Sequence, residues 1–128
     1  MSVSITLVGP PALRQHTRSI LKTGHHTVQY LPHLSDLQRL LREAALLPGQ
    51  IVIGTVEDVA LIRRLRECCQ VSVIVVSAHP SIEQAVTLMQ AGAADYIAHD
   101  ALTEARLNEA LQHVWREHQT QQAFDQTV

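Results

Sequence analysis

Short apolar segments alternate along the chain with longer segments in which apolar residues recur every three or four positions. The short segments are rich in β-branched residues, which is typical of β-strands. The longer segments have the periodicity of helices that bury one face. The pattern predicts strands at 3–8, 27–31, 51–53, 71–76 and 96–98, and helices at 11–23, 35–48, 56–69, 81–92 and 102–118.

Two of the predicted helices begin with a recognisable capping pattern. The segments Ser35-Asp36-Leu37-Gln38 and Ser81-Ile82-Glu83-Gln84 each place a serine three residues before a glutamine. In a capping box, the serine side chain accepts a hydrogen bond from the backbone of that third residue. We therefore expect helices to begin at these two serines, and we expect the second helix to end at Gly92.

The regular alternation of strands and helices predicts an α/β fold. Short connections and right-handed crossovers give a parallel sheet with helices on both faces. The continuously apolar strand at 71–76 is expected at the centre of the sheet, and the alternating strand at 27–31 at its edge. The 128 residues suffice for one domain. We expect that domain at 1–118, followed at 119–128 by a polar tail or the start of a linker to an output domain.

Composition excludes several classes of function. Four aromatic residues and a net charge of −2 argue against binding of nucleic acid. The adjacent Cys68 and Cys69 cannot cross-link distant segments, and no histidine motif with metal-ligand spacing occurs among the eight histidines. No signal peptide and no apolar run of about 20 residues is present, so we expect a cytoplasmic protein without membrane contact.

Two segments carry a family resemblance. Val73 to His79 followed by Ser81 to Val86 resembles the fourth strand and helix of bacterial response-regulator receiver domains, and Ala91 to Ile97 resembles the run that enters their fifth strand. Pro11 to Arg14 is a weaker match to the start of their first helix. The resemblance covers about residues 3–118. It implies a flavodoxin-like (βα)5 three-layer sandwich with strand order 2-1-3-4-5.

The chain departs from that family at the phosphorylation site. Working receivers carry acidic residues after the first strand, an aspartate at the end of the third and a lysine after the fifth. Here the corresponding residues are Gly9-Pro10, Thr55 and His99, whereas Ser77 and Tyr96 match the hydroxyl and the switch aromatic. Mg²⁺ needs oxygen ligands that this site lacks, and phosphoryl transfer depends on the metal and the lysine.

We therefore interpret the chain as a pseudo-receiver without metal, cofactor or enzymatic activity. Its vestigial pocket is expected to consist of Gly9, Pro10, Thr55, Ser77 and His99. In the family, the aromatic swings inward when the hydroxyl residue moves toward the phosphate. We expect Tyr96 to be held in one orientation instead. A slipped register would make Asp58 a weak alternative acceptor, although Glu57 and Asp58 also suit the first turn of a helix.

The resulting hypothesis is a phosphorylation-independent signalling module that acts by protein–protein contact. The resemblance implies the N-terminal regulatory domain of a two-component transcriptional regulator, with a protein partner, a fused output domain or a homodimer. Contact is expected on the face of the fourth helix, fifth strand and fifth helix, which holds Gln84, Met89, Gln90, Tyr96, Arg106 and Gln112. The alternatives are a small-ligand sensor that uses the strand ends, and an atypical receiver that is phosphorylated on Asp58.

Charged residues suggest further contacts. Arg14, Arg18 and Lys22 form a basic stripe on the first helix, which we expect to pair with acidic residues of the fifth helix: Glu104, Glu109 and Glu117. The run from Arg63 to Arg66 is interpreted as a solvated helix face. His79 and His99 are expected at the carboxyl ends of adjacent strands, beside the vestigial pocket.

Overall fold

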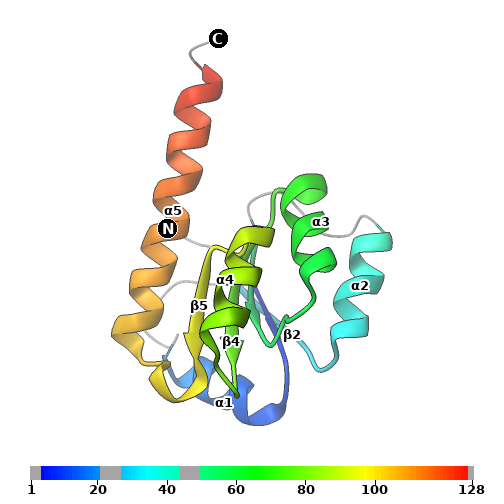
Figure 1. Ribbon diagram of the computed structural model, residues 1–128, viewed down its shortest axis with the longest axis vertical. Helices are drawn as coiled ribbons and strands as arrows, with labels where there is room; N and C mark the ends of the chain where they lie inside the picture. The colour runs from blue at the N-terminus through cyan, green and yellow to red at the C-terminus, as the bar shows by residue number, and fades with distance from the viewer. Residues whose placement is uncertain (1–3, 21–26, 44–49, 127–128) are drawn as a thin grey trace.

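The structure is a computed structural model that describes residues 4–20, 27–43 and 50–126 (Figure 1). Its centre is a sheet whose strands are all parallel and lie in the order β2-β1-β3-β4-β5. This order and the parallel pairing confirm the predicted fold. The strands are β1 (Ser4–Val8), β2 (Thr27–Leu31), β3 (Ile51–Gly54), β4 (Ser72–Ser77) and β5 (Asp95–Ala98).

Helices cover both faces of the sheet. One hydrophobic cluster joins the sheet to α2, α3 and α4, and a second joins its other face to α1 and α5. The result is a three-layer sandwich, from which the far end of α5 extends (Figure 1). The helices are α1 (Pro11–Ile20), α2 (Leu34–Arg42), α3 (Val59–Cys69), α4 (Ile82–Ala91), the 3₁₀ helix η2 (His99–Ala101) and α5 (Glu104–Gln126).

β4 is buried along its whole length, as its sequence predicts, but the central strand of the sheet is β3 and not β4. All six of its residues are buried. Val73 and Val75 pack toward α3 and α4, while Ile74 and Val76 pack toward α1 and α5. Each such side chain contributes about 1.5–3 kcal/mol when it leaves water, so this strand is a major contributor to the stability of both cores.

The helix starts differ from the prediction at two places. α2 begins at Leu34 and not at Ser35, and the backbone N–H of His33 donates to Asp36 Oδ2 at 3.3 Å. Leu34 packs against the same core as Leu37, so the buried face of the helix begins one residue earlier than the serine pattern indicates. α3 begins at Val59 and not near residue 56, because fully buried Val56 packs in the loop before it.

The ends of α4 and α5 show one prediction confirmed and one corrected. Ser81 Oγ accepts a hydrogen bond from the backbone of Gln84 at 3.0 Å, and Gly92 ends α4 with a φ of 117°. α5 continues to Gln126, so most of the segment predicted as a polar tail is helical. That segment contains glutamine and alanine but no glycine or proline, and helix propensity extends the helix without an apolar face.

Candidate functional site

The carboxyl ends of β1, β3 and β4 lie side by side in the sheet, and we call the residues there, Gly9, Thr55 and Ser77, the strand-end site. The backbone N–H of Thr55 donates to the carbonyl of Val8 at 3.1 Å, which ties the end of β3 to β1. A Cβ placed on Gly9 would lie 3.3 Å from Thr55 Oγ1. The first- and third-strand positions of the predicted pocket are therefore in contact.

Gly54 makes this close approach possible. A Cβ on Gly54 would lie 1.9 Å from the carbonyl oxygen of Val8, which no side chain can tolerate. Because Gly54 is the last residue of β3, its lack of a side chain sets where Thr55 emerges from the sheet. Nothing in the sequence pattern had indicated a role for this glycine.

Ser77 faces two side-chain acceptors. It is fully buried at the end of β4, and its Oγ lies 3.4 Å from Glu57 Oε1 and 3.3 Å from Gln84 Oε1. A hydroxyl has one proton to donate, so these two acceptors share it. Glu57 comes from the loop after β3 and Gln84 from the first turn of α4. The carboxylate of Glu57 is thus the acidic group that reaches the strand-end site.

Tyr96 is joined to the same acceptor. Its hydroxyl donates to Gln84 Oε1 at 2.5 Å and lies 3.4 Å from the backbone nitrogen of Ser81, which donates to it. The half-buried ring packs against the core formed with α2, α3 and α4. Gln84, named from the sequence as an interface residue, is half-buried here and links the hydroxyls of Ser77 and Tyr96. The sequence held one indication of this role: Gln84 lies in the first turn of the helix that follows β4.

The other predicted pocket residues have contacts of their own. Pro10 is exposed, and the carbonyl of Gly9 accepts a hydrogen bond of 2.7 Å from the hydroxyl of Tyr30. His99 begins η2, where its ring centroid lies 5.8 Å from that of His16 on α1. His16 Nε2 in turn lies 2.5 Å from the carbonyl oxygen of Leu102.

These contacts link η2 to α1. His16 was not among the residues singled out from the sequence; it lies three residues after buried Leu13 and is itself an exposed residue of α1. His79 is exposed in the loop after β4.

One residue of the basic stripe on α1 contacts the edge strand. The guanidinium of Arg14 lies 4.6 Å from the centre of the Tyr30 ring, a cation–π contact with β2. Tyr30 also packs against the core beneath α1 and α5. Arg14 is therefore directed toward the edge strand. Lys22 lies outside the described residues.

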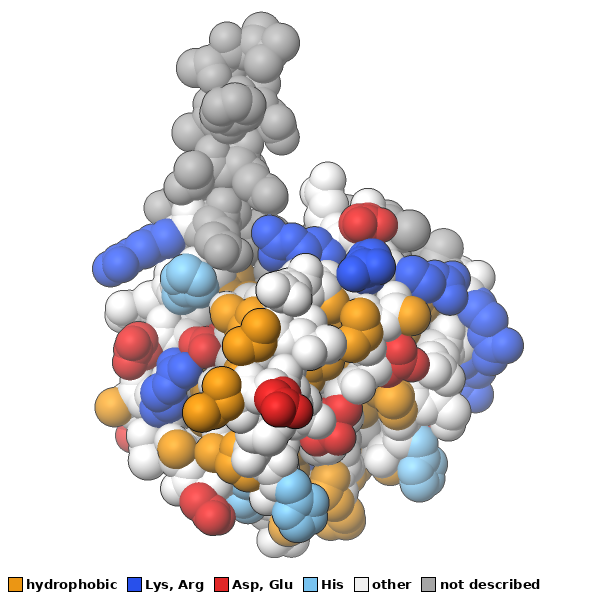
Figure 2. All heavy atoms as spheres, viewed as in Figure 1, with side chains coloured by type: hydrophobic (Ala, Val, Ile, Leu, Met, Phe, Trp, Pro, Cys, Tyr) orange, Lys and Arg blue, Asp and Glu red, His pale blue; other side chains and the backbone are white. Residues whose placement is uncertain are grey.

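The face formed by α4, β5 and α5 combines an ion pair with exposed apolar side chains. Arg106 makes two hydrogen bonds with Asp95, at 2.9 and 2.8 Å, and these raise the pKa of the guanidinium. On α4, Ile82, Val86 and Met89 are 83%, 50% and 43% exposed at helical spacing. Figure 2 shows apolar side chains gathered over this helix. Gln90 and Gln112 are also exposed.

Solved structures share this architecture. A response regulator from Thermotoga maritima superposes with a TM-score of 0.73 at 21% identity, over 89% of this chain and 98% of that one. The chain has the fold of a response-regulator receiver domain. A receiver protein from Pseudoalteromonas atlantica gives a TM-score of 0.69 at 22% identity, over 90% of this chain and 98% of that one.

A longer protein contains the same fold. NtrX from Brucella abortus superposes with a TM-score of 0.80 at 18% identity, over 99% of this chain but 29% of that one. No family model and no curated protein matches the sequence. At these identities the likeness is one of fold.

Two further findings concern the described residues alone. No group of three or more histidine, cysteine, aspartate or glutamate side chains among them is arranged to hold a metal ion. None of the helices in the described ranges has the length and apolar character that crossing a membrane requires.

Proposed function

We propose that this chain is a receiver-like signalling module that works without phosphorylation, through contact with other proteins. The observation that carries the proposal is the bonding of Ser77. In receivers, the hydroxyl at this position moves toward the phosphate. Here its proton is shared between Glu57 Oε1 and Gln84 Oε1, while Thr55 occupies the end of β3 where an acceptor aspartate would stand.

The donor set at the strand ends does not fit Mg²⁺, which a working receiver requires. Mg²⁺ prefers several oxygen ligands in octahedral array, carboxylates above all. The residues after β1 are Gly9, Pro10 and Pro11, and the carbonyl of Gly9 already accepts a bond from Tyr30. Thr55 offers a neutral hydroxyl, which is a weak nucleophile without an adjacent base.

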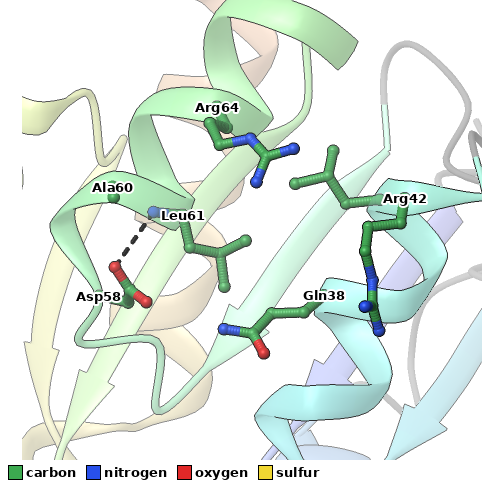
Figure 3. Close-up of a pocket in the computed structure, with 7 residues that line it drawn as sticks. Gln38, Arg42, Asp58, Ala60, Leu61 and Arg64 are labelled. Carbon is green, nitrogen blue, oxygen red and sulfur yellow. Dashed lines mark hydrogen bonds between the residues drawn. The ribbon is translucent and has the colours of Figure 1, made fainter.

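Asp58 is poorly suited to replace the missing acceptor. Its Oδ1 accepts a hydrogen bond of 3.2 Å from the backbone of Leu61 and so caps the N-terminus of α3. Its side chain also lines a groove between α2 and α3, whose lining includes none of Gly9, Thr55 and Ser77 (Figure 3). Both observations favour a structural role for this carboxylate, because a capping side chain contributes about 1 kcal/mol to its helix.

The output face is proposed to be that of α4, β5 and α5. Its three exposed apolar residues, Ile82, Val86 and Met89, form one stripe on α4, and contact with a protein would remove them from water. The partner is an output domain in the same chain, a separate protein or a second copy. The match to about 29% of NtrX supports a module within a longer regulator of two-component type.

The side chains at the strand ends disfavour the small-ligand alternative. Gln84 and Glu57 both reach Ser77, so they occupy space that a ligand would need at the end of β4.

Intact-mass measurement after incubation with acetyl phosphate and Mg²⁺ tests the proposal. The expected result is no added phosphoryl group, whereas a working receiver treated in parallel gains one. A phosphoryl group that is added to this chain and disappears in Asp58→Ala would instead identify Asp58 as an acceptor and overturn the proposal.

A further inference from the structure

A groove separates α2 from the beginning of α3. It has a volume of about 240 Å³ and is lined by Gln38, Leu41, Arg42, Asp58, Ala60, Leu61 and Arg64. We call it the α2–α3 groove. Figure 3 shows Arg64 reaching from α3 toward α2, and Gln38 reaching from α2 toward α3. The groove lies on the face of the sheet opposite to α1 and α5.

The floor of the α2–α3 groove is apolar and its rim is polar. Leu41 and Leu61 are 9% and 4% exposed, so they form the base and belong to the core. Gln38, Arg42 and Arg64 are exposed along the rim. A ligand that fits must therefore carry an apolar group between polar or charged ends.

The charge of the rim is positive where the two arginines stand. Among the described residues, no carboxylate lies within ion-pair distance of Arg42 or Arg64. The acid in the groove, Asp58, already accepts the backbone N–H of Leu61. Figure 2 shows basic side chains in an arc over α3 and α2. Guanidinium groups without a counter-charge bind carboxylates strongly, by paired charge-assisted hydrogen bonds.

We propose that the α2–α3 groove binds an acidic, amphipathic segment of a partner protein. An apolar side chain of that segment packs on Leu41 and Leu61, and its carboxylates pair with Arg42 and Arg64. A small anion would use one arginine and leave the apolar floor uncovered, whereas a peptide can span both helices. The groove is separate from the strand-end site, so this inference is independent of whether the chain accepts phosphate.

The test uses a short fluorescein-labelled peptide of alternating glutamate and leucine pairs, with anisotropy to measure affinity and ¹⁵N-NMR to locate binding. Arg42→Glu/Arg64→Glu should weaken binding by about tenfold or more, because two attractive contacts become repulsive. Arg39→Glu/Arg63→Glu is the matched control. It makes the same change of charge on the same two helices, outside the groove lining, and should weaken binding by less than about twofold.

Several outcomes would overturn the proposal. Equal weakening by both double variants would mean that net charge, and not the groove, attracts the peptide. Equal binding of a peptide with lysine in place of glutamate would show that the arginines do not recognise carboxylates. Equal binding of a peptide with serine in place of leucine would show that the apolar floor does not contribute. Equal competition by inorganic phosphate would indicate a general anion site. Self-association that Arg42→Glu/Arg64→Glu abolishes would assign the groove to a second copy of this chain.

Discussion

The hydroxyl of Tyr96 donates a hydrogen bond of 2.5 Å to the side-chain oxygen of Gln84. The same oxygen lies 3.3 Å from Ser77 Oγ, so one residue of α4 is bonded both to the last residue of β4 and to the second residue of β5. A side-chain carbonyl oxygen has two lone pairs and can accept both bonds. Tyr96 is therefore oriented by α4 and needs no group at the end of β3 to hold it.

Gln84→Ala should release Tyr96 and destabilise the protein. The substitution removes the acceptor of two half-buried or buried hydroxyls, which costs about 1–3 kcal/mol. Urea unfolding measures the loss, and NMR of the Tyr96 ring measures its motion. Gln90→Ala is the control, because Gln90 is an exposed residue of the same helix and should change stability by less than about 0.5 kcal/mol. A ring signal and a stability unchanged in Gln84→Ala would contradict the assigned role.

Beryllofluoride with Mg²⁺, which imitates the phosphorylated state of receivers, should leave this protein unchanged. The hydrogen bonds of Ser77 to Glu57 and Gln84 are internal, and Thr55 provides no carboxylate to hold the fluoride adduct. Sedimentation velocity and ¹H–¹⁵N spectra with and without the reagent check this. Coordinated shifts at Ser77 and Tyr96, or a change of oligomeric state, would show that the switch still operates.

The sequence was sufficient for the order of the elements because each one carries its own periodicity. β4 was recognised by its unbroken apolar run, and α4 by the serine and glycine at its ends. The predicted start of α2 at Ser35 was wrong because a capping pattern is short enough to occur by chance. The burial of Leu34 decides where α2 begins. The length of α5 was underestimated because its last part has no apolar periodicity, and helix propensity alone gives no visible pattern in the sequence.

The site was harder to predict than the fold because its contacts join distant segments. Sequence spacing places Gln84 on the first turn of α4. It does not show which neighbouring residues the side chain of Gln84 reaches. The pairing of His16 with His99 depends on how η2 packs against α1. The α2–α3 groove likewise forms only when α2 and α3 pack together and bring Leu41 and Leu61 to its base. From the sequence alone, Arg64 therefore could not be distinguished from any other solvent-exposed helix residue.

Asp95→Ala, on the face of α4, β5 and α5, should lower the free energy of unfolding of the protein by about 1 kcal/mol. Asp95 accepts two hydrogen bonds from Arg106, and both side chains are partly exposed, at 20% and 30%, so solvent screening limits the loss. Because these bonds raise the pKa of Arg106, its guanidinium stays charged at every pH below the ordinary arginine range. A double-mutant cycle with Arg106→Ala measures the coupling, and Asp100→Ala, an exposed acid, is the control. A coupling near zero would leave Arg106 available to a partner.

Gly54→Ala should be the most damaging small substitution at the strand-end site. The added Cβ would lie 1.9 Å from the oxygen and 2.8 Å from the carbon of the Val8 carbonyl. Both atoms are backbone, so β1 and β3 must move apart, at a cost of about 3 kcal/mol or more. Gly92→Ala is the matched comparison. There the nearest atom, at 2.7 Å, belongs to the flexible side chain of Arg66, and the loss should be about 1 kcal/mol from the left-handed backbone. Urea unfolding of both variants measures the two losses of stability. Equal losses would mean that the contact between Gly54 and Val8 does not fix the position of Thr55.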